Sequence, residues 1–195
     1  WPAWAAEALA WGREKSVSRA FLASPGQRLT RGAVARLLYE SAGQPVAHEE
    51  CPFSDVSEKD AVAVGWAAGQ GYLTGVGDGT YEPGRPVTRQ EFAAILWRQA
   101  GTPEVPVQGL ERFGDAGTVS EWARDAVLWC QQAGVMAGRS GDKLAPEDTI
   151  TTAEALVMLE RAAGLPVEEA MEICLRSYKH DMDSGFDLLH IDPTK

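Results

Sequence analysis

The sequence predicts a mainly α-helical protein made of three helix-loop-helix repeats, with short extended segments in the loops. Three observations support this prediction. Residues 29–45, 87–103 and 150–166 align without a gap, and each has a capping threonine as its second residue and closes with Gly-x-Pro. A second helix, marked by a tryptophan, precedes each of them. Internal repeats of this kind are the signature of an architecture in which neighbouring units bury a shared core.

Each aligned segment is predicted to form one helix. The helix starts are predicted from the leading threonines, Thr30, Thr88 and Thr151. Glu91 and Glu154 stand three residues further on and complete a capping box in the second and third copies. The first copy has Ala33 at this position, so we expect its cap to be weaker.

The same segments carry a buried stripe and a stop signal. Apolar residues recur four, seven and eight positions after each threonine, which is the pattern of one helix face: Val34, Leu37, Leu38, Phe92, Ile95, Leu96, Ala155, Met158 and Leu159. Left-handed C-terminal stops are expected at Gly43, Gly101 and Gly164. Proline cannot continue a helix, and it follows each stop at Pro45, Pro103 and Pro166.

The preceding helices are marked by Trp11, Trp66 and Trp129, and Trp4 corresponds to Trp122 further upstream. In the second copy, Asp78-Gly79 predicts a tight turn that leads into a short extended segment. We divide the chain into repeats at 1–45, with an incomplete start, 46–104 and 105–166, followed by a tail at 167–195.

Composition excludes several classes of function. The net charge of −10 argues against a nucleic-acid binder, which needs clustered Lys and Arg. No run approaches the ~18 apolar residues that span a bilayer, so no membrane insertion is expected. Three cysteines at unrelated spacings fit neither a disulfide framework nor a zinc site.

No catalytic residue, metal site or cofactor is predicted. Asp78 and Glu82 resemble part of a calcium loop but lack its alternating ligands. Glu91 and Glu154 are explained by capping rather than by hydrolysis. The histidines form no recognisable catalytic or metal-binding set. We therefore expect a protein that is not an enzyme.

Several motifs resemble the S-layer homology repeat. They are FSDV at 53–56, GYLTGVGDGTYEPGRPVTRQEFA at 71–93 and, more loosely, the segments at 113–127 and 134–155. The resemblance covers residues 1–166 and is closest in the second copy. It implies a pseudo-threefold helical bundle at the outside of the cell, associated with the cell wall or S-layer.

The resemblance also implies a noncatalytic anchoring function. Its expected partner is an anionic secondary cell wall polysaccharide with pyruvylated amino sugars, bound in grooves between neighbouring repeats. Arg89 matches the family's recognition arginine and Arg31 matches it in the first copy, whereas the third copy has Thr152. Gly75 and Gly138 match a loop glycine that lets the sugar approach the backbone; the first copy has Ala20.

Two interpretations remain open for these residues. An arginine beside the amides of a helix start can hold a carboxylate, but Arg31 and Arg89 would be idle if they were solvated surface residues. Trp66 and Trp129 either line a groove or pack in the core. Since Arg89 keeps the cap, the acid and the loop glycine, we expect the second repeat to dominate affinity. Thr152→Arg would restore a third site if the groove walls keep the family shape.

The alternative function is a degenerate scaffold of the same type that binds another protein, motivated by the missing third arginine. The tail is predicted to contain an amphipathic helix at 167–178 and, within 185–193, a short buried strand that ends in Asp192. It is an edge element packed on the repeats, the start of a downstream domain of the same protein, or a segment foreign to the repeats.

Overall fold

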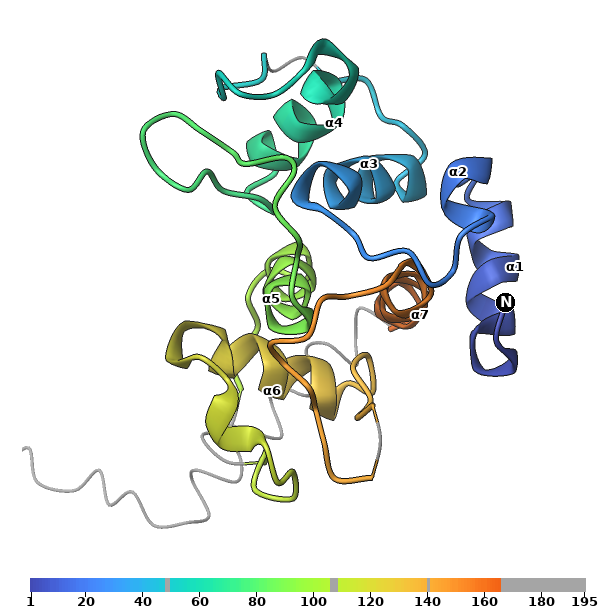
Figure 1. Cartoon of the computed structure of the whole chain (residues 1–195), viewed down its shortest axis with the longest axis vertical. Helices are drawn as coiled ribbons and strands as arrows, with labels where there is room; N and C mark the ends of the chain where they lie inside the picture. Colours follow the sequence, from blue (N-terminus) through green and yellow to red (C-terminus); the bar gives the residue numbers. More distant parts are fainter. Residues whose placement is uncertain (48–49, 106–108, 140, 166–195) are drawn as a thin grey trace, which may run out of the picture.

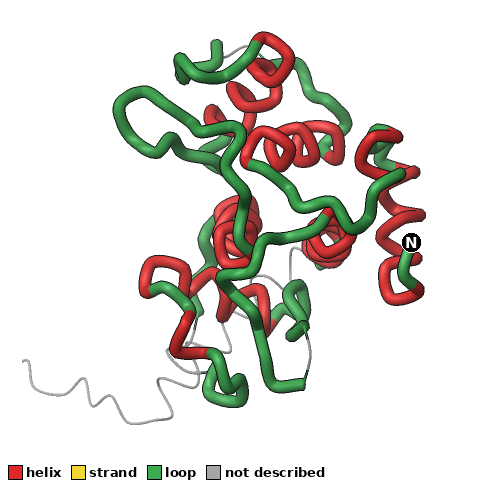
Figure 2. Tube along the Cα trace, viewed as in Figure 1, coloured by secondary structure: helices red, strands yellow, loops and turns green. Residues whose placement is uncertain are grey.

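The computed structural model describes residues 1–47, 50–105, 109–139 and 141–165, and within them the regular secondary structure is helical (Figure 2). The prediction of a mainly α protein is confirmed. Extended backbone pairs only through isolated bridges in this part of the chain. The helices are α1 Ala6–Glu14, α2 Arg19–Leu22, α3 Arg31–Ser41, α4 Glu58–Gly69, α5 Arg89–Gln99, α6 Arg124–Gln132 and α7 Thr152–Ala163, with 3-10 turns η1 Ala3–Ala5, η2 Ala116–Thr118 and η3 Glu121–Ala123.

The helices α3, α5 and α7 begin directly after the three predicted threonines. Thr88 and Thr151 accept from the third amide of their helix, and Glu91 and Glu154 accept in return from the threonine backbone. Both capping boxes are therefore confirmed. Thr30 accepts a hydrogen bond from the Ala33 amide without a reciprocal partner, as the alanine predicts.

Two of the three helix stops have the expected geometry. Gly43 has a φ of +83° and Gly101 a φ of +86°, a left-handed conformation that costs glycine little. The prediction is wrong at Gly164, which has a φ of −82° and remains right-handed at the end of α7.

A closed ring of three backbone hydrogen bonds joins the segments that lead into α3, α5 and α7. The Leu29 amide donates to Ile150, Ile150 to Val87, and Val87 back to Leu29, at 2.9 to 3.0 Å. All three side chains are buried. Each segment therefore contacts both of the others, which gives the fold its approximate threefold arrangement.

The packed helix pairs join different repeats. α3 packs on α4, α5 on α6, and α7 returns to pack on α1. Figure 1 shows α3, α5 and α7 near the centre, with α4, α6 and α1 outside them. Because the first and last described helices close the circle, no repeat buries its apolar face by itself.

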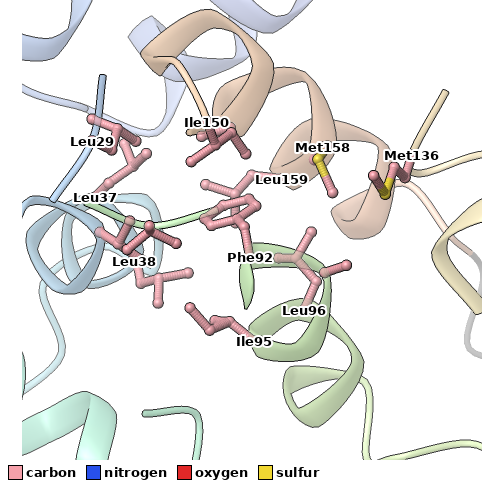
Figure 3. Close-up of a cluster of buried hydrophobic side chains, with 14 of the residues drawn as sticks. Leu29, Leu37, Leu38, Phe92, Ile95, Leu96, Met136, Ile150, Met158 and Leu159 are labelled. Atoms are coloured by element: carbon pink, nitrogen blue, oxygen red, sulfur yellow. The ribbon is translucent and has the colours of Figure 1, made fainter. Parts of the chain in front are cut away.

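The central core is formed by the predicted apolar stripes. Figure 3 shows α3, α5 and α7 contributing side chains that meet in one cluster: Leu37, Leu38, Phe92, Ile95, Leu96, Met158 and Leu159, with Leu29, Ile150 and Met136 from the connecting segments. The cluster holds the starts of the three helices in fixed relative positions. Side chains at those starts are thus presented by a rigid frame.

In the second and third repeats, an aspartate near the start of the repeat holds the loop by accepting two backbone hydrogen bonds. Asp55 accepts from the amides of Tyr81 and Glu82 at 2.8 and 2.7 Å. Asp115 accepts in the same way from Leu144 and Ala145, both at 2.8 Å. The predicted tight turn at Asp78-Gly79 is confirmed by positive φ at both residues. The helix and strand predicted at 167–178 and 185–193 lie outside the described residues.

Candidate functional site: two grooves between repeats

The Arg89 side chain crosses from the second repeat into the loop of the third. Nε donates to the Leu144 carbonyl at 3.1 Å and Nη2 to the Ala137 carbonyl at 2.9 Å. Nη1 pairs with Glu154 Oε1 at 2.9 Å. The residue is 4% exposed, so its interpretation as a solvated surface arginine is wrong.

The Arg31 side chain makes the equivalent crossing from the first repeat into the loop of the second. Nε donates to the Tyr81 carbonyl at 2.7 Å and Nη2 to the Thr74 carbonyl at 2.6 Å, while the guanidinium lies 4.4 Å from the Tyr81 ring centre. Nη1 donates to none of the described residues. Arg31 therefore keeps one donor nitrogen that Arg89 has committed to Glu154.

Arg31 and Arg89 differ in their ion pairing because the glutamate near Arg31 is bonded to other groups. Glu91 occupies the helix position that Glu154 occupies in the third repeat. One oxygen of Glu91 caps α5, and the other pairs with Arg85 Nη2 at 2.8 Å. Arg31 is thus left without a carboxylate of its own, and a ligand carboxylate could take that place.

The backbone amides at the helix starts already have partners. The first two amides of α5, those of Arg89 and Gln90, donate to the carbonyls of Asp148 and Pro146 at 2.9 Å. The first two amides of α3 and α7 are bonded in the same way to carbonyls of other repeats. The helix dipole still favours an anion here, but the expected direct contribution of these amides to a ligand is not supported.

Each arginine lies at a groove. The Arg31 groove has a volume of about 230 Å³ and is lined by Arg31, Val34, Leu73, Thr74, Gly75, Val76, Arg85, Val87, Glu91, Ala94, Ile95, Arg98 and Trp122. The Arg89 groove has a volume of about 610 Å³ and is lined by Pro2, Trp4, Pro25, Gly26, Arg89, Val135, Ala137, Gly138, Arg139, Thr151, Ala153, Glu154, Val157, Met158 and Arg161. Each contains three arginines and one carboxylate among these residues.

Burial sets the electrostatics of the Arg89 groove. It lowers the pKa of Arg89, an effect that Glu154 opposes, but arginine stays charged in proteins. Burial also raises the pKa of Glu154, yet bonds from Thr151 and the charges of Arg89 and Arg139 outweigh it, so this pKa lies below its ordinary value. Glu154 is therefore ionised at neutral pH and already neutralises part of the positive charge of the groove arginines.

Both predicted glycines line a groove, Gly75 with Arg31 and Gly138 with Arg89. A Cβ on Gly75 would lie 2.7 Å from the Phe53 ring and from the Thr80 carbonyl. On Gly138 it would lie 3.0 Å from the Lys143 carbonyl. The close approach of the loop to itself thus requires glycine, whether or not a sugar also approaches.

The grooves pair each arginine with the loop and acid of the next repeat, which changes the premise of the expected affinity ranking but does not test the ranking itself. Arg31 faces Gly75 and Glu91, and Arg89 faces Gly138 and Glu154. The expectation that Arg89 alone has full support assumed that each arginine uses the loop and acid of its own repeat. That assumption is wrong: each groove contains a loop glycine and a glutamate from the next repeat, although only Arg89 pairs with its glutamate.

Two predicted tryptophans do not belong to the grooves. Trp66 is 7% exposed and Trp129 1% exposed, and both lie in the core. Their interpretation as packing residues is confirmed, and their placement as ligand contacts is corrected because neither lines the Arg31 or the Arg89 groove. The groove tryptophans are Trp4 and Trp122, which are 60% and 59% exposed. Trp4 and Trp122 occupy corresponding positions in the first and third repeats, and this correspondence was the sequence signal that could have identified them.

At the boundary between the third and first repeats, the described residues form no arrangement comparable to these two grooves. Thr152 is fully buried and its hydroxyl donates to the Gln27 carbonyl at 3.3 Å. The first repeat has helix α2 where the others have their loop, and Ala20 lies on it. The proposed restoration by Thr152→Arg assumed groove walls at Gly138 and Trp129, but Thr152 faces the first repeat instead.

Other features of the described residues bear on function. None of the groups of His, Cys, Asp and Glu within them could hold a metal ion. Among the helices that the structure describes, none has the length and apolar character to cross a membrane.

The fold and the grooves define a helical repeat module with arginine-lined grooves at two of its boundaries. Two segments of the chain, residues 52–93 and 112–156, match the family model of the S-layer homology domain. They fall in the second and third predicted repeats; the first repeat and the tail lie outside them. This match associates the two segments with anchoring domains of the cell wall or S-layer.

The curated relatives include surface and glycan-degrading proteins. "Cell surface glycoprotein 1" of Acetivibrio thermocellus is 25% identical over 71% of this chain, and "Exoglucanase XynX" of the same organism is 30% identical over 62%. "Endo-1,4-beta-xylanase A" of Thermoanaerobacterium saccharolyticum is 32% identical over 52% of the chain. The matched regions span 6%, 11% and 9% of these relatives.

Proposed function

We propose that the chain anchors a larger protein to the cell surface by binding an anionic wall polysaccharide that carries pyruvylated amino sugars. The observation that supports this function is the repeated placement of a guanidinium. In both grooves, two carbonyls of the next repeat fix an arginine, and Arg31 keeps Nη1 for a carboxylate that enters its groove. Fixed, charged donors lose little freedom on binding, which favours a specific anion contact.

Local charge supports an acidic ligand in spite of the acidic chain. The net charge of −10 repels polyanions in general, so attraction must come from short-range contacts. Arg31, Arg85 and Arg98 line one groove and face the single lining carboxylate of Glu91. A small carboxylated sugar fits this arrangement better than a long, uniformly charged polymer.

The relatives support an accessory rather than a catalytic function. Their names describe a surface glycoprotein, an exoglucanase and a xylanase, which differ in activity. A region that covers 6 to 11% of each relative and recurs across these activities is suited to a shared anchoring task.

Co-sedimentation with purified cell walls tests this function. We expect the protein to pellet with intact walls and to stay in solution after chemical removal of the secondary polymer. Boiled walls that retain the polymer serve as the control for bound wall proteins. Binding that survives polymer removal but is lost with the wall proteins would favour the protein-binding scaffold, and absence of binding to any wall would refute the anchoring function.

A further inference from the structure

Two of the seven tryptophans are largely exposed, and each lines one of the grooves. Trp4 lies in the 3-10 turn η1 and Trp122 in the 3-10 turn η3, directly before α1 and α6. Water contact with an indole is unfavourable, and exposed aromatic side chains are concentrated at interaction sites. Both indoles lie beside arginines, in grooves that the proposed function already uses.

Each groove therefore combines all three repeats. In the Arg31 groove the arginine comes from the first repeat, Gly75 and Glu91 from the second, and Trp122 from the third. The Arg89 groove is built by the same rule, one repeat further along the chain. Its arginine comes from the second repeat, its glycine and acid from the third, and its tryptophan, Trp4, from the first.

The same rule assigns four departures from the repeat pattern to one groove. A third groove would combine the third repeat's Thr152 with the first repeat's Ala20 and Ala33, in place of arginine, glycine and acid. Its tryptophan position, in the second repeat, is Lys59. These four changes are distributed over three copies in the sequence, but by this rule they fall together at a single boundary, where Thr152 is buried.

We propose that Trp4 and Trp122 are the platforms on which the sugar rings of the ligand pack, and that the protein holds two glycan sites. This inference rests on the proposed function. The C–H groups on one face of a pyranose carry partial positive charge and suit the negative face of an indole. With the ring on the indole, the carboxylate of the sugar is directed to the groove arginines.

Calorimetric titration with a soluble pyruvylated amino-sugar disaccharide tests the inference. The parent protein is expected to bind two equivalents. Trp122→Ala and Trp4→Ala are each expected to weaken one site about tenfold or more, a usual effect of removing a tryptophan at a binding site. Lys59→Ala is the matched control at the third equivalent position, and it should retain both sites and their affinity.

The variants also need a test of folding, and circular dichroism with thermal unfolding provides it. Trp4→Phe and Trp122→Phe keep a ring and should retain more affinity than the alanine variants. Should the parent bind walls but not the disaccharide, the same comparison is made by co-sedimentation, where the Trp4→Ala/Trp122→Ala double variant must lose binding that Lys59→Ala keeps.

The possible failures are distinguishable. Two bound equivalents in the parent with unchanged affinity in both alanine variants would overturn the platform and leave the anchoring function intact. One or three equivalents in the parent would overturn the two-site assignment. A parent that binds neither the disaccharide nor polymer-bearing walls would overturn the proposed function itself.

Discussion

Arg89 Nη1 lies 2.9 Å from Glu154 Oε1, across the boundary between the second and third repeats. The arginine begins α5 and the glutamate caps α7, so one ion pair connects two helix starts. The same glutamate also pairs with Arg139. Arg89 is thus both a wall of its groove and a structural link, whereas Arg31 lacks this ion pair.

Arg89→Ala is expected to destabilise the fold as well as to affect binding. The substitution removes three hydrogen bonds and leaves the carbonyls of Leu144 and Ala137 without these donors. Because Arg139 still compensates Glu154, we expect a loss of about 2–4 kcal/mol, at or below the usual range for breaking a buried pair. Urea unfolding at neutral pH measures it. An unfolding curve that coincides with the parent's would contradict the structural function of Arg89.

Arg31→Ala is expected to act mainly on binding. Its open Nη1 is suited to a charge-assisted contact worth about 1.5–3 kcal/mol, so the affinity for an acidic disaccharide should fall about ten- to a hundredfold. Calorimetry measures the affinity. Arg13→Ala removes the same charge from an exposed position outside the groove linings and is the matched control. Equal affinity in the parent and Arg31→Ala would show that this donor holds no ligand group.

The helices could be predicted from the sequence because their signals are local. A threonine, a glutamate three residues later and an apolar stripe determine where α5 and α7 begin and which face is buried. The stop at Gly164 was mispredicted because glycine permits a left-handed conformation without requiring it.

The composition of the grooves could not be predicted in the same way. Alignment matches Arg89 with Arg31, but it does not say that Arg31 reaches the loop of Gly75 or that the ring closes through α1 and α7. Such pairings depend on tertiary packing between distant segments. Tryptophan exposure depends on it too, which is why Trp66 was placed in a groove and Trp122 was missed.

Stability is expected to fall at low pH partly through Glu154. Its pKa in the folded protein lies below its ordinary value of 4.5, so its ionised form stabilises the fold above the ordinary value. That contribution is lost as the pH falls through the lower, folded value. The difference in unfolding free energy between the parent and Glu154→Gln should therefore shrink from pH 7 to pH 3.

Denaturant unfolding at several pH values measures this difference. Asp55 and Asp115, whose pKa values are also lowered through backbone hydrogen bonds in spite of desolvation, are present in both proteins and cancel in the comparison. Glu147→Gln, an exposed change of the same charge, is the control. A constant difference across this pH range would argue against the contribution of Glu154.

Gly75→Ala is expected to displace the loop that holds Arg31. The new Cβ would lie 2.7 Å from both the Phe53 ring and the Thr80 carbonyl, closer than a real contact allows. Overpacking of this kind commonly costs about 1–3 kcal/mol. Thermal unfolding and disaccharide titration should both detect it. Gly84→Ala, with open space at its Cβ, should leave stability and binding unchanged; equal effects of the two variants would refute the steric argument.

Thr152→Arg is expected to lose stability without gaining a third site. Thr152 is fully buried and bonded to the Gln27 carbonyl, so a guanidinium there must displace packed side chains. The first repeat offers no equivalent of the loop that fixes Arg31, because α2 occupies Arg19–Leu22. It also has Ala33 where the other repeats place a glutamate, so the new charge would lack a carboxylate.

Overpacking and burial of an unpaired charge together should cost more than about 2 kcal/mol. Titration of the variant at a temperature where it remains folded should still give two equivalents of disaccharide. Thr152→Ser is the matched control, since it keeps the hydroxyl and the hydrogen bond to Gln27. A stable Thr152→Arg protein that bound a third equivalent would contradict this expectation. It would show that the third boundary fails to bind ligand only because it lacks the arginine, and not because arginine, loop glycine, acid and tryptophan are all missing there.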